Sequence, residues 1–156
     1  MVKNVFKKLG KKQKNNKGFS LVELIVVIAI MAVLVGVLAP QLIKYVEKSR
    51  EATDIQTCDN IATALKTYYA DEEVAASATA TVTVTLGKTE LGTVADTAAD
   101  TAVKDAGLTK AKIKGTKWTG DKITIVYNKA DGTITYTGDS PYYHSDKDQF
   151  KKGPKS

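Results

Sequence analysis

The longest apolar run in the chain extends from Phe19 to Leu38 and reads FSLVELIVVIAIMAVLVGVL. Its only strongly polar side chains are those of Ser20 and Glu23. Twenty helical residues rise about 30 Å, which is the thickness of the hydrocarbon core of a bilayer. The run therefore predicts a helix that is apolar on every side and long enough to span a membrane.

After Pro40 the apolar positions recur at spacings of three and four residues, which is typical of an amphipathic helix. These positions are Leu42, Ile43, Val46, Ile55, Cys58, Ile61, Ala62, Leu65, Tyr68 and Tyr69. The charged residues are expected on the opposite face, and they are Lys44, Glu47, Lys48, Arg50, Glu51, Asp54, Asp59 and Lys66. Together the two segments predict one helix over about residues 20–70, whose second half packs its apolar stripe against a sheet.

The remaining chain is predicted to form that sheet. Residues 81–86 and 122–127 alternate with period two, and residues 133–137 return after a turn at 128–132 that contains Asp131-Gly132. Residues 110–114 and 116–119 are also expected to be strands, with a break at Gly115. The fold class is thus α+β, with a long N-terminal α-helix packed against an antiparallel sheet of three to four strands.

Two shorter features complete the predicted head. Residues 71–80 are small and acidic and predict a loop. Residues 96–106 predict a short helix, because Gly107 follows them at a position that favours glycine. Trp118 and the stretch from Ile55 to Tyr69 are expected in the core.

The positive charge of the chain is concentrated at its N-terminus. The chain has 156 residues and a net charge of +6, but its first 18 residues hold seven lysines and no acid. The rest has 16 basic and 17 acidic residues, so its net charge is −1. A nucleic-acid partner is possible but not indicated by such a distribution. Lysines before an apolar run favour an orientation with the N-terminus in the cytoplasm.

Three interpretations of this N-terminal segment compete. A cleaved secretory signal would have a shorter apolar run and a small-residue cut site after it, and Ala39 followed by Pro40 is a poor one. A plain signal anchor explains the lysines and the run. It does not explain Glu23 or the order of residues 17–23.

The third interpretation rests on a resemblance. The segment KGFSLVEL, from Lys17 to Leu24, resembles the class III signal of type IV prepilins and pseudopilins. The similarity is tight over residues 17–40 and weak beyond. In that family a membrane prepilin peptidase cuts after the glycine and methylates the new N-terminal residue. The resemblance therefore implies a cut between Gly18 and Phe19, N-methylation of Phe19, and an assembly role for Glu23.

A carboxylate such as that of Glu23 needs a partner among apolar helices. The amine of Phe19 that the cut would create lies four positions away on the same helical face. The partner is therefore expected to be this amine, either of the same subunit or of a neighbouring one. A tolerated carboxylate near the membrane surface is the plain alternative.

Gly36 and Pro40 predict a kink, since proline removes a backbone hydrogen bond and clashes with the preceding turn. A simple bend at the membrane boundary is the alternative. The expected organisation is a basic leader over residues 1–18, a transmembrane and filament-core helix over 19–40, and an amphipathic helix half with a globular head over 41–156.

The residues give no indication of catalysis, a cofactor or a metal. His144 has no second histidine near it, and the acidic residues around it match no calcium loop, so a solvated surface loop is expected. Cys58 is the only cysteine and is expected to be a buried small hydrophobe. The lack of a disulfide-closed C-terminal loop favours a Gram-positive, clostridial source.

The expected function is that of a structural subunit, not an enzyme. The resemblance implies a homopolymeric type IV pilus, a surface filament for adhesion, motility, aggregation or biofilm growth. The implied partners are the prepilin peptidase, the pilus assembly machinery and, before assembly, the cytoplasmic membrane, from which the subunit passes to the cell surface. The alternative is a pseudopilin of a type II-like secretion or DNA-uptake system.

Overall fold

A computed structural model describes residues 18–70, 80–94 and 96–155. The chain divides into two compact units, Met1–Pro40 and Gln41–Ser156, and helix α1 (Leu21–Tyr69) contributes to both. Its bounds confirm the prediction of one helix over about residues 20–70. The basic leader and the predicted loop at 71–79 lie outside the described residues.

The part of α1 that belongs to the first unit is apolar over its whole surface. Every large hydrophobic side chain from Phe19 to Leu38 is at least 47% exposed. Within the described residues, α1 is the one helix whose length and hydropathy suffice to cross a membrane. This surface is apolar because the run from Phe19 to Leu38 has too few polar residues to form a polar face on the helix.

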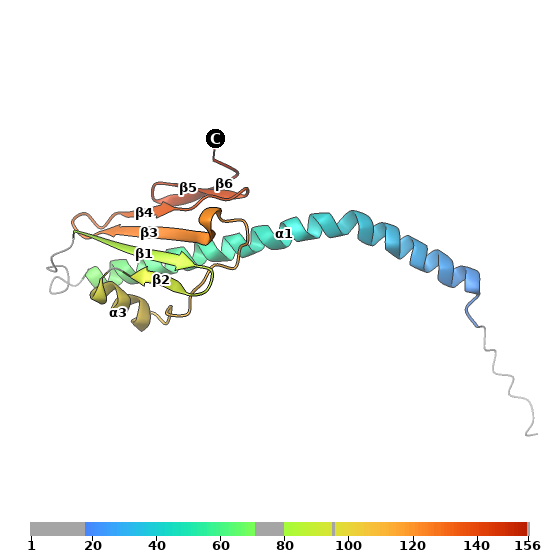
Figure 1. The fold of residues 1–156 in the computed structure, drawn as a ribbon, viewed down its shortest axis with the longest axis horizontal. Coiled ribbons are helices and arrows are strands. Elements are labelled where there is room, and N and C mark those ends of the chain that lie inside the picture. The colour runs from blue at the N-terminus through green and yellow to red at the C-terminus, as the bar shows by residue number, and fades with distance from the viewer. Residues whose placement is uncertain (1–17, 71–79, 95, 156) are drawn as a thin grey trace, which may run out of the picture. The chain divides into compact units, whose positions relative to one another are not determined.

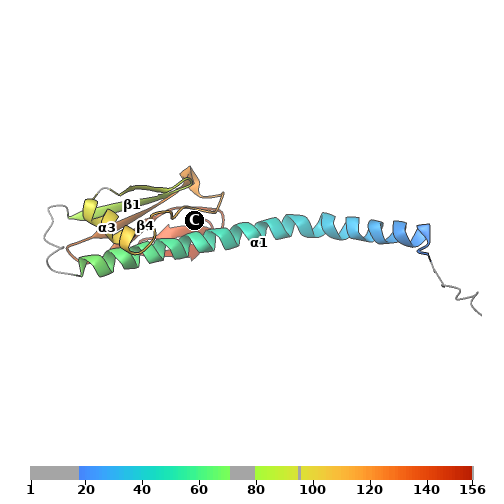
Figure 2. The same ribbon diagram turned by 90° about the horizontal axis from the view of Figure 1, so that it is seen from below.

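The second unit is built around an antiparallel sheet, which confirms the predicted α+β class. The sheet has four strands in the order β2-β1-β3-β4. These strands are β1 (Thr81–Gly87), β2 (Leu91–Val94), β3 (Lys122–Asn128) and β4 (Ile134–Thr137). Strands β1 and β3 pair along their full length, from Thr81 opposite Asn128 to Gly87 opposite Lys122. In Figure 2 the second half of α1 lies along one face of this sheet.

The core lies between that face and α1. The alternating residues of β1 and β3 that point inward are buried, as are the α1 residues on the core side of the helix. The fully buried apolar side chains of the three elements are those of Cys58, Ile61, Leu65, Val82, Val84, Leu86, Ile123 and Ile125. Cys58 and Trp118 are buried in this core as the sequence predicts.

Helix α3 (Thr97–Asp105) lies beside β2 (Figure 1) and confirms the short helix predicted after residue 95. Asp96 caps its N-terminus, because its carboxylate accepts a hydrogen bond from the Ala98 amide. Gly107 has a φ of +72°, which is the left-handed conformation expected of a residue just after a helix.

Two predictions about the head are wrong, and one strand was not predicted. Residues 110–114 and 116–119 form no strand, because the backbone amides around Gly115 bind carboxylates of α1 instead of a neighbouring strand. A short 3-10 helix, η2 (Thr119–Asp121), begins at the last residue of this segment. The tail is not a solvated loop but the hairpin of β5 (Tyr143–Asp146) and β6 (Gln149–Lys152). Strand β2 was not predicted, because Gly92 interrupts its short pattern.

The apolar stripe of α1 also begins later than its spacing suggests. Leu42, Ile43 and Val46 are 63%, 69% and 42% exposed, so the sheet does not cover them. The buried part of α1 begins at Glu47.

Candidate functional site

The first candidate site is the start of α1. Gly18 and Phe19 precede the helix without regular secondary structure and are exposed, Phe19 to 85%. Glu23 lies in the first helical turn. Its Oε2 accepts a 3.0 Å hydrogen bond from the backbone amide of Ser20.

This contact is half of a capping box, in which a carboxylate at the third helical position binds the amide of the N-cap residue. The Ser20 carbonyl accepts the first helical hydrogen bond, from the Leu24 amide, at 3.1 Å. The Glu23 carboxylate thus binds the backbone amide of Ser20, the residue that follows Phe19. Whether the amine that a cut after Gly18 would create becomes its partner stays a prediction.

The kink was predicted at the end of the first unit. Gly36 and Pro40 both lie inside α1, which is helical through them. A β-carbon added at Gly36 would meet no heavy atom within 4 Å. The kink predicted over these two residues therefore stays a prediction.

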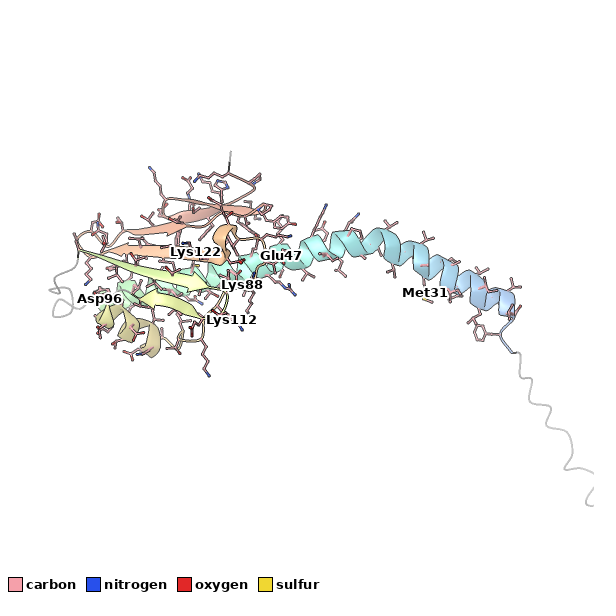
Figure 3. The ribbon with its side chains drawn as sticks, in the orientation of Figure 1. Met31, Glu47, Lys88, Asp96, Lys112 and Lys122 are labelled. Atoms are coloured by element: carbon pink, nitrogen blue, oxygen red, sulfur yellow. The ribbon has the colours of Figure 1, made fainter. Side chains whose placement is uncertain are left out.

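The second candidate site is a set of three carboxylates that the sequence placed on the charged, exposed face of α1. That placement is wrong for Glu47, Glu51 and Asp54, which are 7%, 0% and 0% exposed. They occupy successive turns of α1 where it enters the head, and Figure 3 labels Glu47 at this point. We call these three residues the carboxylate stripe.

Asp54 binds the segment that was expected to be two strands. Its Oδ1 accepts the Lys114 amide at 2.7 Å, and its Oδ2 accepts the Gly115 amide at 2.7 Å. The indole Nε1 of Trp118 also donates to Oδ2, at 2.9 Å. One buried carboxylate thus satisfies three donors, which offsets the cost of removing its charge from water.

Glu47 continues the same arrangement one turn before Glu51. Its Oε1 accepts hydrogen bonds from both the backbone amide and the hydroxyl of Thr116, the latter at 3.0 Å. Its Oε2 lies 3.7 Å from a guanidinium nitrogen of Arg50. The segment 114–118 is therefore held against α1 by carboxylates rather than by a strand partner.

Glu51 is less well satisfied than its neighbours. Its Oε2 accepts a 2.5 Å hydrogen bond from the Ser140 hydroxyl, whose oxygen in turn accepts the amides of Tyr142 and Tyr143. Its Oε1 is buried and has no hydrogen-bond partner among the described residues. The pKa of Glu51 is raised overall. Burial is the main cause, the charges of Glu47 and Asp54 add to it, and the hydrogen bond from Ser140 acts in the opposite direction.

Gly115 allows the loop to approach this closely. A β-carbon there would lie 2.7 Å from Cγ of Glu51, 2.8 Å from Nε1 of Trp118 and 2.9 Å from Oδ2 of Asp54. Such distances are shorter than van der Waals contact, so only glycine fits. Gly115 was predicted to be a break between two strands. The structure shows instead that glycine is needed there because the loop lies so close to α1.

The opposite end of the head has a smaller polar cluster, and Figure 3 labels its Asp96. The Lys129 Nζ lies 2.8 Å from Oδ2 of Asp96, and the two side chains are 4% and 12% exposed. The Tyr69 hydroxyl donates to the same oxygen at 3.3 Å, and its ring lies 4.7 Å from the Lys129 nitrogen. The hydrogen bond from Lys129 lowers the pKa of the Asp96 carboxyl.

His144 does not lie on a solvated loop. It is half-buried in β5, and its Nδ1 lies 2.9 Å from the Gly153 carbonyl oxygen. In the described part of the chain, no group of three or more His, Cys, Asp or Glu residues is arranged to hold a metal ion.

Comparison with known proteins identifies one feature. Residues 13–39 match the family model of the prokaryotic N-terminal methylation motif, which is the class III signal of type IV pilins. The match covers the end of the leader, the Gly18–Phe19 junction, Glu23 and the apolar run. No curated protein and no solved structure shows significant similarity to the chain. The chain thus carries a prepilin-type signal followed by a long apolar helix and an α+β head.

Proposed function

We propose that this protein is a structural subunit of a type IV pilus. The observation that carries the proposal is the methylation motif at residues 13–39, joined to a helical segment whose large apolar side chains, from Phe19 to Leu38, are all exposed. A helix with no covered face needs lipid before assembly and other subunits after it. A polymer of identical subunits meets the second need without any further partner.

Processing supplies the first step. Prepilin peptidase is proposed to cut between Gly18 and Phe19 and to methylate the Phe19 amine. The cut removes seven lysines that could not enter an apolar filament core without a large desolvation cost. It keeps the apolar helix, which a cut after Ala39 would discard. The exposed, non-helical chain at Gly18 and Phe19 suits a protease substrate.

Assembly is proposed to depend on Glu23. In filaments, its carboxylate would pair with the Phe19 amine of a neighbouring subunit and so set the axial position of each arriving subunit. The contact with Ser20 supports this role, since it holds the carboxylate at the very start of the helix. A kink over residues 36–40 would let the filament extend under tension.

The proposed location follows the same order. The leader and residues 19–40 anchor the precursor in the cytoplasmic membrane with the N-terminus inside. The assembly machinery then moves the subunit into an extracellular filament, where residues 41–156 form the head. Adhesion, surface motility, aggregation and biofilm growth are the roles proposed for such a filament.

The same motif equally supports a pseudopilin of a secretion or DNA-uptake system, because both classes share the methylated signal. Long shed filaments made mainly of this chain would favour the pilin. Short filaments that occur only with an active secretion system would favour the pseudopilin.

The deciding experiment is mass spectrometry of the mature N-terminus from cells with and without prepilin peptidase. We expect a chain that begins with N-methylated Phe19 in the first case and an intact leader in the second. A Gly18→Ala variant should remain uncut, whereas Gly36→Ala, which changes a glycine inside the helix, should be cut normally. A leader that stays on in the presence of the peptidase, or a cut after Ala39, would contradict the proposal.

A further inference from the structure

One face of α1, near the start of the carboxylate stripe, carries a small basic pocket. Gln41, Lys44, Tyr45 and Lys48 follow one another at helical spacing and line it together with Tyr142 from the tail. Its volume is about 240 Å³. We call this group the basic pocket, and all its residues belong to the second unit.

The wall that Tyr142 provides is fixed in place. Its backbone amide donates to the Ser140 hydroxyl oxygen at 3.1 Å, and its carbonyl accepts the Gly153 amide at 2.7 Å. Ser140 is itself hydrogen-bonded to the fully buried Glu51. The backbone of Tyr142 is thus held in the head by two hydrogen bonds, and the other lining residues all project from α1.

The pocket is positively charged and uncompensated. None of its lining residues is acidic, and neither Lys44 nor Lys48 has a carboxylate within 4.0 Å among the described residues. The nearest acid in sequence, Glu47, is committed to Thr116 and Arg50. Like charges four residues apart on a helix repel each other, so an anion between the two ammonium groups would stabilise this arrangement.

The sequence position of the pocket indicates where the anion comes from. Lys44 follows the end of the apolar run at Leu38 by six residues, or roughly 9 Å along a helix. The headgroup layer extends about 5–7 Å beyond the hydrocarbon on each side, and lysine side chains reach back toward it. Tyrosines such as Tyr45, which is 69% exposed, are typical of this layer.

We propose that the basic pocket binds the phosphate of an anionic phospholipid in the leaflet on the head side of the membrane. The lipid would hold the base of the head at the membrane surface until the subunit leaves the bilayer. The inference rests on the proposed membrane-anchored state of the subunit, but it does not require cleavage or polymerisation, since precursor and mature chain both contain the pocket.

The test measures lipid retention by the full-length precursor, purified in detergent and titrated with phosphatidylglycerol or phosphatidylcholine under native mass spectrometry. We expect one phosphatidylglycerol to bind with clear preference over phosphatidylcholine. Each lysine near an anionic surface contributes roughly a fivefold gain in affinity, so the double variant K44Q/K48Q should bind phosphatidylglycerol about 25-fold more weakly. The double variant K66Q/K122Q removes the same charge from exposed positions outside the pocket and should bind like the wild type.

Three results would overturn the proposal. These are equal binding of the two lipids, equal losses in the two double variants, and inorganic phosphate that competes as well as the lipid does. A pocket that instead receives a second copy of the chain would leave lipid binding unchanged in K44Q/K48Q and alter only filament formation. Prepilin peptidase cleavage of each variant is measured alongside, so that failure of the lipid site is distinguished from failure of the proposed pilin function.

Discussion

The indole Nε1 of Trp118 donates a 2.9 Å hydrogen bond to Oδ2 of Asp54, a residue 64 positions earlier in the chain. Both side chains are buried, and the same carboxylate binds the amides of Lys114 and Gly115. A segment without regular secondary structure is thereby attached to α1. The stability of the head should therefore depend strongly on Asp54.

The first prediction concerns Asp54→Ala. The substitution leaves three donors without an acceptor, at a cost of about 1–3 kcal/mol for each donor that water does not reach. We expect the free energy of unfolding to fall by about 3 kcal/mol or more. Urea unfolding of the full-length protein in detergent, followed by circular dichroism and by the fluorescence of the sole tryptophan, measures this. The control Asp105→Ala, at an exposed position of α3, should change stability by less than about 0.5 kcal/mol.

The second prediction concerns Gly115→Ala. The new methyl group would approach Glu51, Trp118 and Asp54 at less than 3.0 Å and force the loop away from α1. Overpacking of this kind costs typically 1–3 kcal/mol, and the loss of the Asp54 contacts would add to it. Gly36→Ala is the matched control, because a β-carbon there meets nothing within 4 Å. Equal unfolding midpoints for the two variants would show that the close approach at Gly115 is not required.

The burial pattern of α1 shows how much of this structure could be predicted from the sequence. The buried apolar positions of α1, from Cys58 to Tyr69, were predicted from their spacing and are confirmed. The same spacing continued toward the N-terminus leads to Asp54, Glu51 and Glu47, so the signal for their burial was present. It was outweighed by their charge, because a carboxylate is rarely buried unless donors surround it. Those donors come from residues 114–118 and Ser140, and no local pattern places them against α1.

Some strands could likewise be predicted from the sequence and others could not. Strands β1 and β3 were predicted because each has an alternating pattern, and the structure pairs them with each other over seven residues. The hairpin of β5 and β6 was not predicted, because only Tyr143 among its residues is buried and no alternation results. Its position depends on tertiary contacts such as the hydrogen bond from the Tyr136 amide to the Lys147 carbonyl, at 2.8 Å. The prepilin-type signal was identified from residues 17–24, and the family match over residues 13–39 confirms it.

The third prediction concerns the pH dependence that Glu51 confers. Its pKa is raised in the folded state, so the native protein binds a proton there more tightly than the unfolded chain does. The contribution of Glu51 to stability is therefore complete below its unfolded pKa, about 4.5, and decreases as the pH rises through the folded value. Glu51→Gln keeps an acceptor for Ser140 but cannot ionise. We expect the variant to gain stability relative to the wild type as the pH is raised from 5 to 8, because the wild type must ionise a buried carboxylate that the variant lacks.

Urea midpoints at several pH values measure this difference. Glu90→Gln, at an exposed position, supplies the control and should follow the wild-type profile. Parallel profiles for Glu51→Gln and the wild type would mean that Glu51 does not titrate differently in the folded and unfolded states.

The fourth prediction compares two ion pairs. Lys129→Ala leaves the Asp96 carboxylate without its main partner in a site where both side chains are largely buried. Removing one member of a buried pair typically costs 3–5 kcal/mol, and we expect a loss near the lower value because Asp96 keeps the Ala98 amide. Lys88→Ala breaks the Lys88–Asp121 pair, whose side chains are 51% and 53% exposed, and should cost less than about 1 kcal/mol. Similar losses in the two variants would contradict the role assigned to burial.

The last prediction separates two roles of Glu23, the helix cap that the structure describes and the charge that assembly is proposed to use. Glu23→Gln keeps an oxygen that can accept the Ser20 amide, since glutamine also serves at this position of a capping box. Glu23→Ala removes both the acceptor and the charge. If the carboxylate recognises the Phe19 amine of a neighbouring subunit, both variants should be processed normally and both should fail to form filaments. Helicity measured by circular dichroism should fall slightly in the alanine variant alone, because one capping contact contributes about 1 kcal/mol.

Electron microscopy of surface filaments together with the mass of the processed N-terminus gives the readout. Normal filaments from Glu23→Gln but none from Glu23→Ala would assign the function of Glu23 to the cap and remove the charge pairing from the mechanism.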